Sequence, residues 1–478
     1  MAVVLRLVLM AAGPLAAPDR ALAGDSPRYI ELAENLLATG TFALAGENSG
    51  HVHLGLTALR ESRDEMPPRN ASGLLPETFR TPGYPALIAL PLALGLPAGS
   101  VLVLHALMAG ALSAVMYRIG RDRLGSPGVG LAAAVVVALH PGLIAGDLRV
   151  LSEGPFALAL WLGVWLAWPR GVEGSKSREN KGYLAAALGG LCLGAAALIR
   201  PIAAPLALCI TAWRVVAGRP GRRKQDAVAA ACIVLGAAAP VALWSARNAQ
   251  LGQGASLSSV PAINAWYYTA VHMDLMETGG DWSTDWPAAV AAQHDKLRAG
   301  LEPDESVTEG ALRLASARFA SDPALYAKAM ARSGGKFALD HSVGTVATTM
   351  GWPYTPMGLR EQMLSGDVTA VLRRPMGWVP LGWTGFNGLL ALLAMAGAMR
   401  LVWIGYWREA ALLAGLVVGV ALATQTNGLE RFRLPVVPAM ALLAAGAWLP
   451  RRHVDGPASV EPKPGPRRAL PLRGSLVR

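Results

Sequence analysis

Residues 24–33 read GDSPRYIELA and interrupt a chain that is otherwise mostly apolar. An acidic side chain, Asp25, directly follows the first apolar segment, and the polar stretch that begins here runs to about residue 81. Its far end reads FRTPGYP at residues 79–85, which sets Arg80 beside a Pro-Gly-Tyr-Pro turn. We expect these two stretches to form one polar loop at the edge of a membrane-embedded helical bundle, and we place the chemistry there.

The composition is that of a multi-span membrane protein. Of 478 residues, 53% are hydrophobic and only 16% are charged. The formal net charge of +11 would suggest nucleic-acid binding in a soluble protein. Here the Lys and Arg residues form short clusters between apolar runs, which the positive-inside rule explains better, so no nucleic-acid partner is predicted. The three cysteines lie inside apolar runs without metal-ligand or redox spacing, and we interpret them as core residues.

The apolar runs predict an all-α polytopic protein. A bilayer is crossed by about 20 apolar residues. Together with the first segment, nine further runs approach this length and give a bundle of about ten transmembrane helices: 101–119, 128–145, 154–168, 183–199, 201–217, 228–246, 378–404, 409–425 and 435–449.

Clusters of Arg and Lys between these runs predict which loops face the cytoplasm, and the remaining connections then face the periplasm. The predicted organisation is a first transmembrane helix or signal-like segment at 1–23, a first periplasmic loop with juxtamembrane helices at 24–100, six transmembrane helices at 101–246, a periplasmic region at 247–377, three transmembrane helices at 378–450 and a disordered basic cytoplasmic tail at 451–478.

Four shorter predictions concern helices in the loops and at the start of the chain. The apolar spacing from Tyr29 to Leu37 predicts an amphipathic helix lying on the membrane surface. Residues 82–96 are apolar but too short to span, so we interpret them as juxtamembrane or re-entrant. A helical run is expected from about Thr308 to Phe337. Residues 1–17 fit a first span or a cleaved signal ending at residues 21–23.

Asp25 is the candidate catalytic residue. A carboxylate at a membrane surface is accessible to a water-soluble acceptor, and it can remove the proton from an acceptor hydroxyl or amine as the new bond forms. The alternative is structural, because Asp25 or Ser26 followed by Pro27 is also a good helix start.

Charged residues at predicted outward turns form further candidate sites. The turn at 146–153 carries Asp147, Arg149, Ser152 and Glu153, of which Glu153 is best placed to face a cavity, and Arg200 stands alone between two other apolar runs. A guanidinium is always charged and offers paired planar donors, which suits a lipid phosphate. Arg431 and Arg433 offer the same chemistry from the last outward turn. The alternatives are an interfacial ion-pair cluster for Glu153 and, for Arg200, a side chain that only snorkels to the interface.

Arg247, Asn248 and Asn264 accompany Trp and Tyr residues where an apolar run enters the large outer region. Aromatic rings with amide and guanidinium donors can stack on a sugar and hydrogen-bond to it. An aromatic belt at the membrane interface is the plain alternative.

Taken in order, these motifs resemble glycosyltransferase family 39 of the GT-C fold, in particular bacterial relatives of the dolichyl-phosphate-mannose protein mannosyltransferases, which are related to the aminoarabinose transferases. The resemblance covers most of the chain. It rests on six motifs: Asp25-Ser26 with Tyr29, Ala33 and Gly40; Arg80-Thr81-Pro82-Gly83-Tyr84-Pro85; Leu151-Ser152-Glu153; Arg200-Pro201; Trp244 with Arg247-Asn248 and Gly252; and Arg431-Phe432-Arg433-Leu434-Pro435.

The resemblance implies a GT-C-like enzyme of the bacterial inner (plasma) membrane and cell envelope. It would move a hexose or pentose, with inversion, from a polyprenyl-phosphate donor to a periplasmic glycan, lipid or protein. The protein itself would be surrounded by membrane lipids. Asp25 matches the first-loop acid proposed as catalytic base. The predicted donor phosphate and sugar site comprises Arg80, Tyr84, Glu153, Arg200, Arg431 and Arg433, and the predicted acceptor or sugar contacts are Tyr29, Arg247, Asn248 and Asn264.

Two departures leave the acceptor class and the phosphate ligands open. Many relatives have an Asp-Glu pair at Asp25-Ser26 and a Lys-Pro pair at Thr81-Pro82. The resemblance implies that members of the protein mannosyltransferase type work without a metal, and the sequence has no dedicated ligand cluster, so no cofactor and no metal-binding residues are assigned and metal dependence stays open.

Two other classes remain as alternatives. A transporter or flippase of lipid-linked glycans would keep its charges within helices near the membrane midplane, whereas here they cluster at turns. A non-catalytic membrane scaffold would tolerate replacement of Asp25, Glu153 and Arg200.

Overall fold

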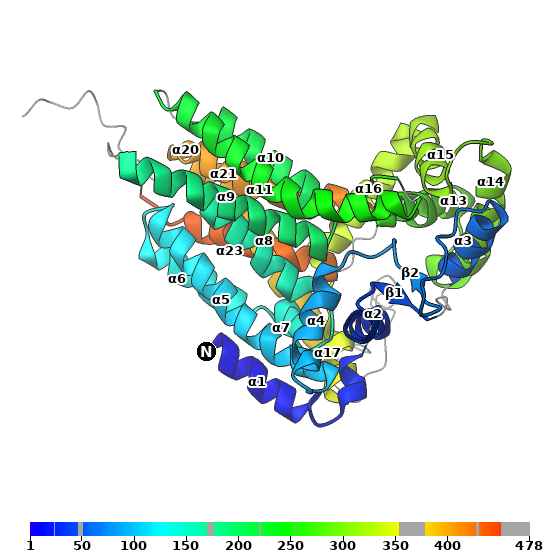
Figure 1. Ribbon diagram of the computed structural model, residues 1–478. Coiled ribbons are helices and arrows are strands. Elements are labelled where there is room, and N and C mark those ends of the chain that lie inside the picture. The colour runs from blue at the N-terminus through cyan, green and yellow to red at the C-terminus, as the bar shows by residue number, and fades with distance from the viewer. Residues whose placement is uncertain are drawn as a thin grey trace, which may run out of the picture.

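The computed structural model describes residues 1–22, 24–45, 51–169, 176–218, 221–252, 254–352, 378–426 and 430–450. This part of the chain is mostly helical and includes a small antiparallel pair of strands, β1 (Ala43–Leu44) with β2 (Leu75–Pro76) (Figure 1). The tail predicted at 451–478 lies outside the described residues, as do residues 353–377 of the predicted periplasmic region.

The chain begins with α1 and two helices of the polar loop, and a bundle follows. The bounds are α1 (Ala2–Ala12), α2 (Ser26–Thr39), α3 (His51–Ser62), α4 (Gly83–Ala93), α5 (Val101–Asp122), α6 (Pro127–Leu139), α7 (Pro141–Asp147), α8 (Glu153–Ala167), α9 (Lys176–Ile199), α10 (Ala203–Val216) and α11 (Arg223–Gln250). Short 3₁₀ turns are η1 (Pro18–Ala21) and η2 (Ala98–Ser100).

The second half first forms a lobe, made of α12–α15 and η3 together with α3, and then returns to the bundle. Its elements are α12 (Val260–Asn264), the π-helical turn η3 (Ala265–Ala270), α13 (Val271–Thr278), α14 (Trp282–Gly300), α15 (Val307–Ser321), α16 (Pro323–Leu339), α17 (Val343–Met350), α20 (Trp378–Trp403), α21 (Trp407–Ala423), α22 (Glu430–Arg433), η4 (Leu434–Val436) and α23 (Val437–Gly446).

Four of the described helices, α5, α9, α11 and α20, are long and apolar enough to cross a membrane, and the bent pair α6 and α7 would make a fifth. Shorter apolar helices include α1, α4, α8 and α10. All nine apolar runs that follow the first segment are helical over most of their length. The structure does not confirm a count of ten spans, which stays a prediction.

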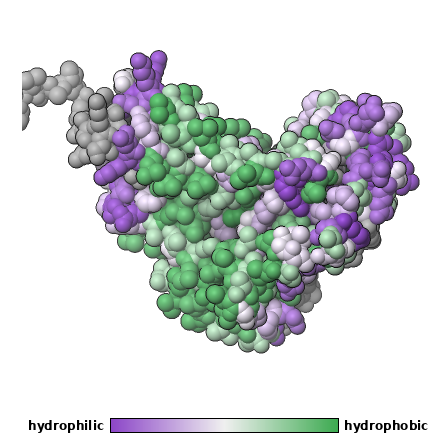
Figure 2. Space-filling view, viewed as in Figure 1, coloured by the Kyte–Doolittle hydropathy of each residue, from purple (hydrophilic) through white to green (hydrophobic). Residues whose placement is uncertain are grey.

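The outer surface of the bundle is apolar, as expected for contact with lipid. Figure 2 shows hydrophobic side chains over most of the bundle on this face. Hydrophilic side chains gather at the end of the bundle far from the lobe and over the lobe itself. Leu235 and Leu243 of α11 are 71% and 76% exposed. The protein is therefore helical and carries an apolar surface of the kind that faces a bilayer.

The run at 128–145 is two helices rather than one, because α6 and α7 meet at a 53° bend. Pro141 has no N–H for the helix ladder, and the residue before a proline is disfavoured in helical geometry. His140 accordingly takes an extended conformation, and its Nδ1 accepts hydrogen bonds from the N–H groups of Gly142 and Leu143 at 3.1 and 3.3 Å. The imidazole therefore caps the start of α7.

The predicted amphipathic helix at 29–37 is present as α2, but its inner face is covered by protein. Tyr29 and Ala33 are buried in one apolar cluster with Tyr84 and Ile88 of α4. Leu32 is fully buried in a neighbouring cluster. The expectation that this whole apolar face lies on the membrane surface is therefore wrong. Side chains of α4, and not lipid, cover Tyr29 and Ala33.

The lobe, defined as α3 and α12–α15 with η3, has a core of its own. The helical run predicted from Thr308 to Phe337 is confirmed, but as two helices, α15 and α16. Asp322 separates them, and its carboxylate accepts the Leu325 N–H at 2.9 Å as the cap of α16.

Helices α9 and α11 approach each other closely where Gly190 of α9 packs against the backbone of Ile233 of α11. A Cβ added at Gly190 would lie 2.2 Å from the carbonyl oxygen of Ile233. We therefore expect Gly190→Ala to separate the two helices and cost about 1–3 kcal/mol, as overpacking usually does. The check is the thermal unfolding midpoint in detergent. Gly415→Ala on α21, where a Cβ meets open space, is the matched control, and an equal loss in both variants would contradict the packing argument.

A candidate active-site cavity

Asp25 occupies the N-cap position of α2, but its side chain makes no capping hydrogen bond. Instead, Nη2 of Arg80 donates to Asp25 Oδ1 at 2.8 Å. Burial alone would raise the pKa of Asp25, but the positive charges of Arg80, Arg431 and Arg200 outweigh burial and hold that pKa below its usual value of 3.8. The structural alternative for this carboxylate, a capping role, is therefore not what the contacts show.

The loop before α4 fixes the guanidinium of Arg80. Glu77 Oε1 accepts the N–H groups of Phe79 and Arg80 at 2.6 and 3.1 Å. Thr81 Oγ1 donates to the carbonyl of Ile199, at the end of α9, at 3.2 Å. Nη1 of Arg80 contacts the Tyr29 hydroxyl at 3.4 Å. The loop is thus tied both to the polar stretch and to the bundle.

Gly83 permits this close approach of loop and bundle. A Cβ at this position would lie 2.7 Å from the carbonyl oxygen of Leu198. The glycine of the predicted Pro-Gly-Tyr-Pro turn therefore has a packing role, because any side chain would push α4 away from the end of α9.

Arg200, which lies just beyond α9, is held by α8. Its Nη2 donates to Glu153 Oε1 at 3.0 Å, and its Nε donates to Ser152 Oγ at 3.1 Å. Glu153 is almost fully buried at 1% exposure, and its other oxygen, Oε2, has no partner within the described residues. Arg200 is thus a positioned cation with a buried counter-charge behind it.

The turn at 146–153 does not act as one charged cluster. Asp147 is buried and pairs with Arg6 of α1 at 2.5 Å, whereas Arg149 donates to Thr349 Oγ1 at 3.0 Å. Only Ser152 and Glu153 reach Arg200 among these four. Asp147 and Arg149 instead fasten α1 and α17 to the bundle.

Arg431 and Arg433 point in different directions. Arg433 is buried and donates to the carbonyls of Phe337 and Asp340 at 2.5 and 3.0 Å, so it braces the end of α16. Arg431 faces the cavity described next, and it forms no ion pair with any carboxylate whose side chain the structure describes. Arg431 is therefore the cation of this region that is most available to a ligand.

An open cavity of about 620 Å³ brings these side chains together. Six of the predicted site residues line it: Asp25, Tyr29, Arg80, Arg200, Asn264 and Arg431. Three arginines face one carboxylate here, and Glu153 lies behind Arg200. The lining therefore carries an excess of positive charge and suits an anionic ligand.

The remaining predicted site residues do not line the cavity. Tyr84 is buried, and its hydroxyl lies 3.3 Å from His105 Nε2. Arg247 donates to the Glu77 and Phe42 carbonyls. The Asn248 amide donates to the Ser256 carbonyl at 3.0 Å. With Glu153 and Arg433, these residues support the walls and loops of the site.

The cavity has apolar walls on the bundle side, which the sequence analysis did not anticipate. They come from the segment after Arg200, α10, α21, α22 and η4, and comprise Ile202, Pro205, Val420, Ala423, Phe432 and Pro435.

Two polar lining residues, Thr424 and Gln425, were also missed. Gln425 has a φ of 51°, which is unusual for a residue with a side chain, and Thr269 Oγ1 donates to its Oε1 at 2.6 Å. The signal in the sequence was a polar Thr-Gln-Thr run that closes an apolar helix shortly before Arg431.

The described residues contain no group of three or more His, Cys, Asp or Glu side chains that could hold a metal ion. The polar groups of the cavity are a carboxylate, guanidinium groups, hydroxyls and amides. They can bind an anion and accept one proton at Asp25.

Fold and cavity together define the class: a helical protein with helices of membrane-spanning length and an open cavity in which arginines outnumber carboxylates. No protein-family model and no curated protein matches the chain. Two solved structures of the Archaeoglobus fulgidus oligosaccharyltransferase are similar to it, one tethered to an acceptor peptide that contains an NVT sequon and one in complex with Zn and sulfate. Both have 14% identity and a TM-score of 0.42, and they cover 88% and 93% of this chain. The chain spans about half (48%) of the length of these proteins.

Proposed function

We propose that the protein is a membrane glycosyltransferase of GT-C type, which moves a sugar from a polyprenyl-phosphate donor to an acceptor. The observation that carries the proposal is the meeting of Asp25, Arg80, Arg200 and Arg431, from four distant parts of the chain, in one open cavity. The resemblance to family 39 and the protein mannosyltransferases implies a meeting of this kind, between a first-loop acid and arginines at the donor phosphate.

The lining of the cavity favours a lipid-linked donor. Guanidinium groups bind phosphate oxygens through paired hydrogen bonds. Beside them, the apolar side chains of α10 and α21 continue into the bundle. A phosphate joined to an isoprenoid chain would satisfy both surfaces at once, whereas a soluble nucleotide sugar would leave the apolar wall without a partner.

The proposed reaction follows from the positions of the charges. Asp25 takes the proton from the acceptor hydroxyl or amine while the oxygen or nitrogen of the acceptor attacks the anomeric carbon of the donor sugar. The bond from that carbon to the phosphate oxygen breaks, and the configuration at the carbon inverts. Arg80, Arg200 and Arg431 stabilise the negative charge that develops on the leaving polyprenyl phosphate. We propose that the cavity faces the periplasm in a bacterial inner membrane.

The direct test is an assay of purified protein in lipid with a panel of polyprenyl-phosphate sugars. Release of polyprenyl phosphate together with a glycosylated acceptor supports the proposal. Movement of an intact lipid-linked glycan across the bilayer, without breakage of the glycosidic bond, would instead support the flippase alternative.

The low pKa of Asp25 predicts the pH dependence of the reaction. Because that pKa lies below 3.8 in the free protein, the carboxylate is ionised throughout the neutral range. Protonation of Asp25 should therefore lower kcat/KM only below about pH 4. A bound phosphate offsets the charges of Arg80, Arg200 and Arg431, so the pKa rises when donor binds. We therefore expect the acidic limb of kcat to lie at higher pH than that of kcat/KM. Coincident limbs would contradict this coupling.

A further inference from the structure

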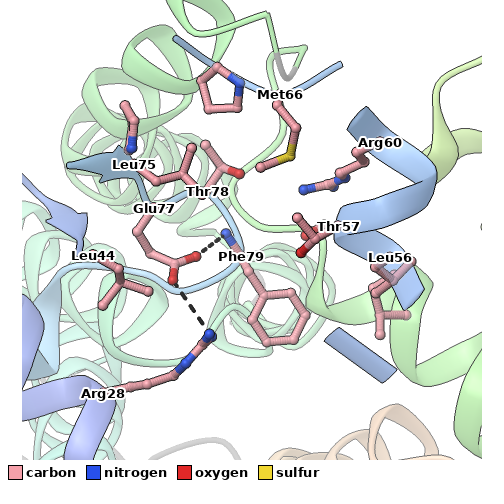
Figure 3. A pocket seen from close by; sticks show the side chains of 14 residues that line it. Arg28, Leu44, Leu56, Thr57, Arg60, Met66, Leu75, Glu77, Thr78 and Phe79 are labelled. Carbon is pink, nitrogen blue, oxygen red and sulfur yellow. Dashed lines mark hydrogen bonds and ion pairs between the residues drawn. The ribbon is translucent and has the colours of Figure 1, made fainter. Parts of the chain in front are cut away.

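A second, smaller pocket of about 80 Å³ lies beside the reaction cavity, between α2, α3 and the loop that carries Glu77 (Figure 3). Phe79 and Ile263 line both spaces, and Ser258 and Ser259 are consecutive residues, one on each side. Phe79, Ile263 and the Ser258–Ser259 pair therefore form part of the wall between the two spaces.

The charges of the small pocket do not balance. Arg28 and Arg60 enter it from α2 and α3 on opposite sides, with Glu77 nearer to Arg28 (Figure 3). Glu77 Oε2 lies 3.9 Å from Arg28 Nη1, while its Oε1 already accepts two backbone N–H groups. Among the residues that line the pocket, two guanidinium groups thus face one carboxylate. The other acids that act on them, Glu31 and Asp25 on Arg28 and Glu65 on Arg60, lie outside the lining.

Arg60 is the less compensated of the two cations. Its Nη2 donates to the hydroxyl of Thr308 at 3.0 Å, a neutral group. The nearby Glu65 pairs with Arg63 at 3.2 Å. Burial lowers the pKa of Arg60, and the charges of Glu65 and Glu77 do not offset it fully. A guanidinium in this setting gains from an anion placed beside it.

Two buried polar atoms of the pocket lining lack a partner within the described chain: Arg60 Nε and Ser259 Oγ. Ser259 is only 5% exposed. Buried polar groups are nearly always hydrogen-bonded in folded proteins, so orphaned donors that line a space point to a bound group. Both atoms can donate to oxygen.

The size of the pocket limits what it holds. One water needs about 10–15 Å³ of such space, so 80 Å³ accommodates a group of a few heavy atoms. We propose that this pocket binds an oxyanion, a carboxylate or phosphate group, carried by the acceptor. Its role in acceptor choice rests on the proposed glycosyl transfer, and its binding of an anion does not.

The first test measures anion binding directly. Purified protein is titrated with sulfate and, separately, with acetate at constant ionic strength, and the thermal unfolding midpoint is followed. Sulfate represents the phosphate group and acetate the carboxylate. We expect saturable stabilisation by one of them. Ser259→Ala should weaken it about 5- to 10-fold, and Arg60→Gln by about 10-fold or more, as expected for loss of hydrogen bonds to a charged group.

The controls separate this pocket from other cations. Arg69→Gln removes an exposed arginine of the same loop outside the pocket, and it should leave the titration unchanged. Ser259→Ala breaks no hydrogen bond of the described structure, so it is expected to fold even if Arg60→Gln does not. The proposal would be overturned if each anion stabilised the Ser259→Ala variant as strongly as the wild type.

The second test uses transfer to acidic and neutral acceptors. Ser259→Ala should raise KM about 5- to 10-fold for acceptors that carry a carboxylate or phosphate, and leave KM for neutral acceptors unchanged. An equal effect on both kinds would overturn the acceptor assignment. Absence of transfer from every donor, with anion binding intact, would instead contradict the proposed function and support the anion site.

Discussion

Asp25→Asn is expected to lower the rate of sugar transfer by about 100- to 10,000-fold, the usual contribution of a general base. Asparagine has nearly the same shape, and its carbonyl oxygen can still accept the hydrogen bond from Arg80 Nη2 that now measures 2.8 Å. The amide cannot take up a proton. The loss should therefore fall on kcat, with donor binding and thermal stability close to wild type.

The control for this experiment is Asp19→Asn. Asp19 is an exposed acid in the turn before α2 and does not line the cavity. It should retain full activity. Transfer at the wild-type rate by folded Asp25→Asn protein would remove Asp25 as the base. Weaker donor binding in that variant, with an unchanged rate of transfer from bound donor, would show that the charge of Asp25 positions Arg80 and takes no proton.

Apolar run length and Lys/Arg clustering predicted the helical bundle, because a bilayer imposes a narrow length on apolar helices. The same signal could not show where a run breaks. Residues 128–145 are uniformly apolar apart from His140, and the 53° bend there arises from Pro141 and an imidazole cap. Nor could periodicity tell lipid from protein as the partner of α2, since both cover an apolar face in the same way.

The cavity was predictable in part because charged residues in apolar surroundings are few. Arg200 and Arg431 stood out on that ground, Asp25 and Arg80 stood out at the two ends of the polar loop, and all four line the cavity. Arg433 satisfied the same criterion and yet braces α16, because two residues along a short helix place a side chain on another face. Which arginine meets a ligand is a property of packing that spacing alone does not contain.

Arg200 and Arg431 also differ in their packing, because Arg200 pairs with a buried glutamate and Arg431 does not. This difference predicts different effects of replacing each arginine. Arg431→Gln is expected to raise the donor KM by about 10- to 100-fold, because a hydrogen bond to a charged phosphate is worth about 1.5–3 kcal/mol. Its thermal stability should stay at the wild-type level, since no carboxylate of the described residues pairs with Arg431. Donor titration and an unfolding curve on the same preparation measure both.

Arg200→Gln should impair both quantities. It leaves Glu153, which is 1% exposed, without its cation, and breaking a buried ion pair from one side typically costs about 3–5 kcal/mol. The double variant Arg200→Gln with Glu153→Gln removes the stranded charge, so stability should recover while the donor KM stays high. Recovery of donor binding along with stability would mean that Arg200 only neutralises Glu153 and does not touch phosphate. Arg431 and Arg80 would then be left to hold the leaving group.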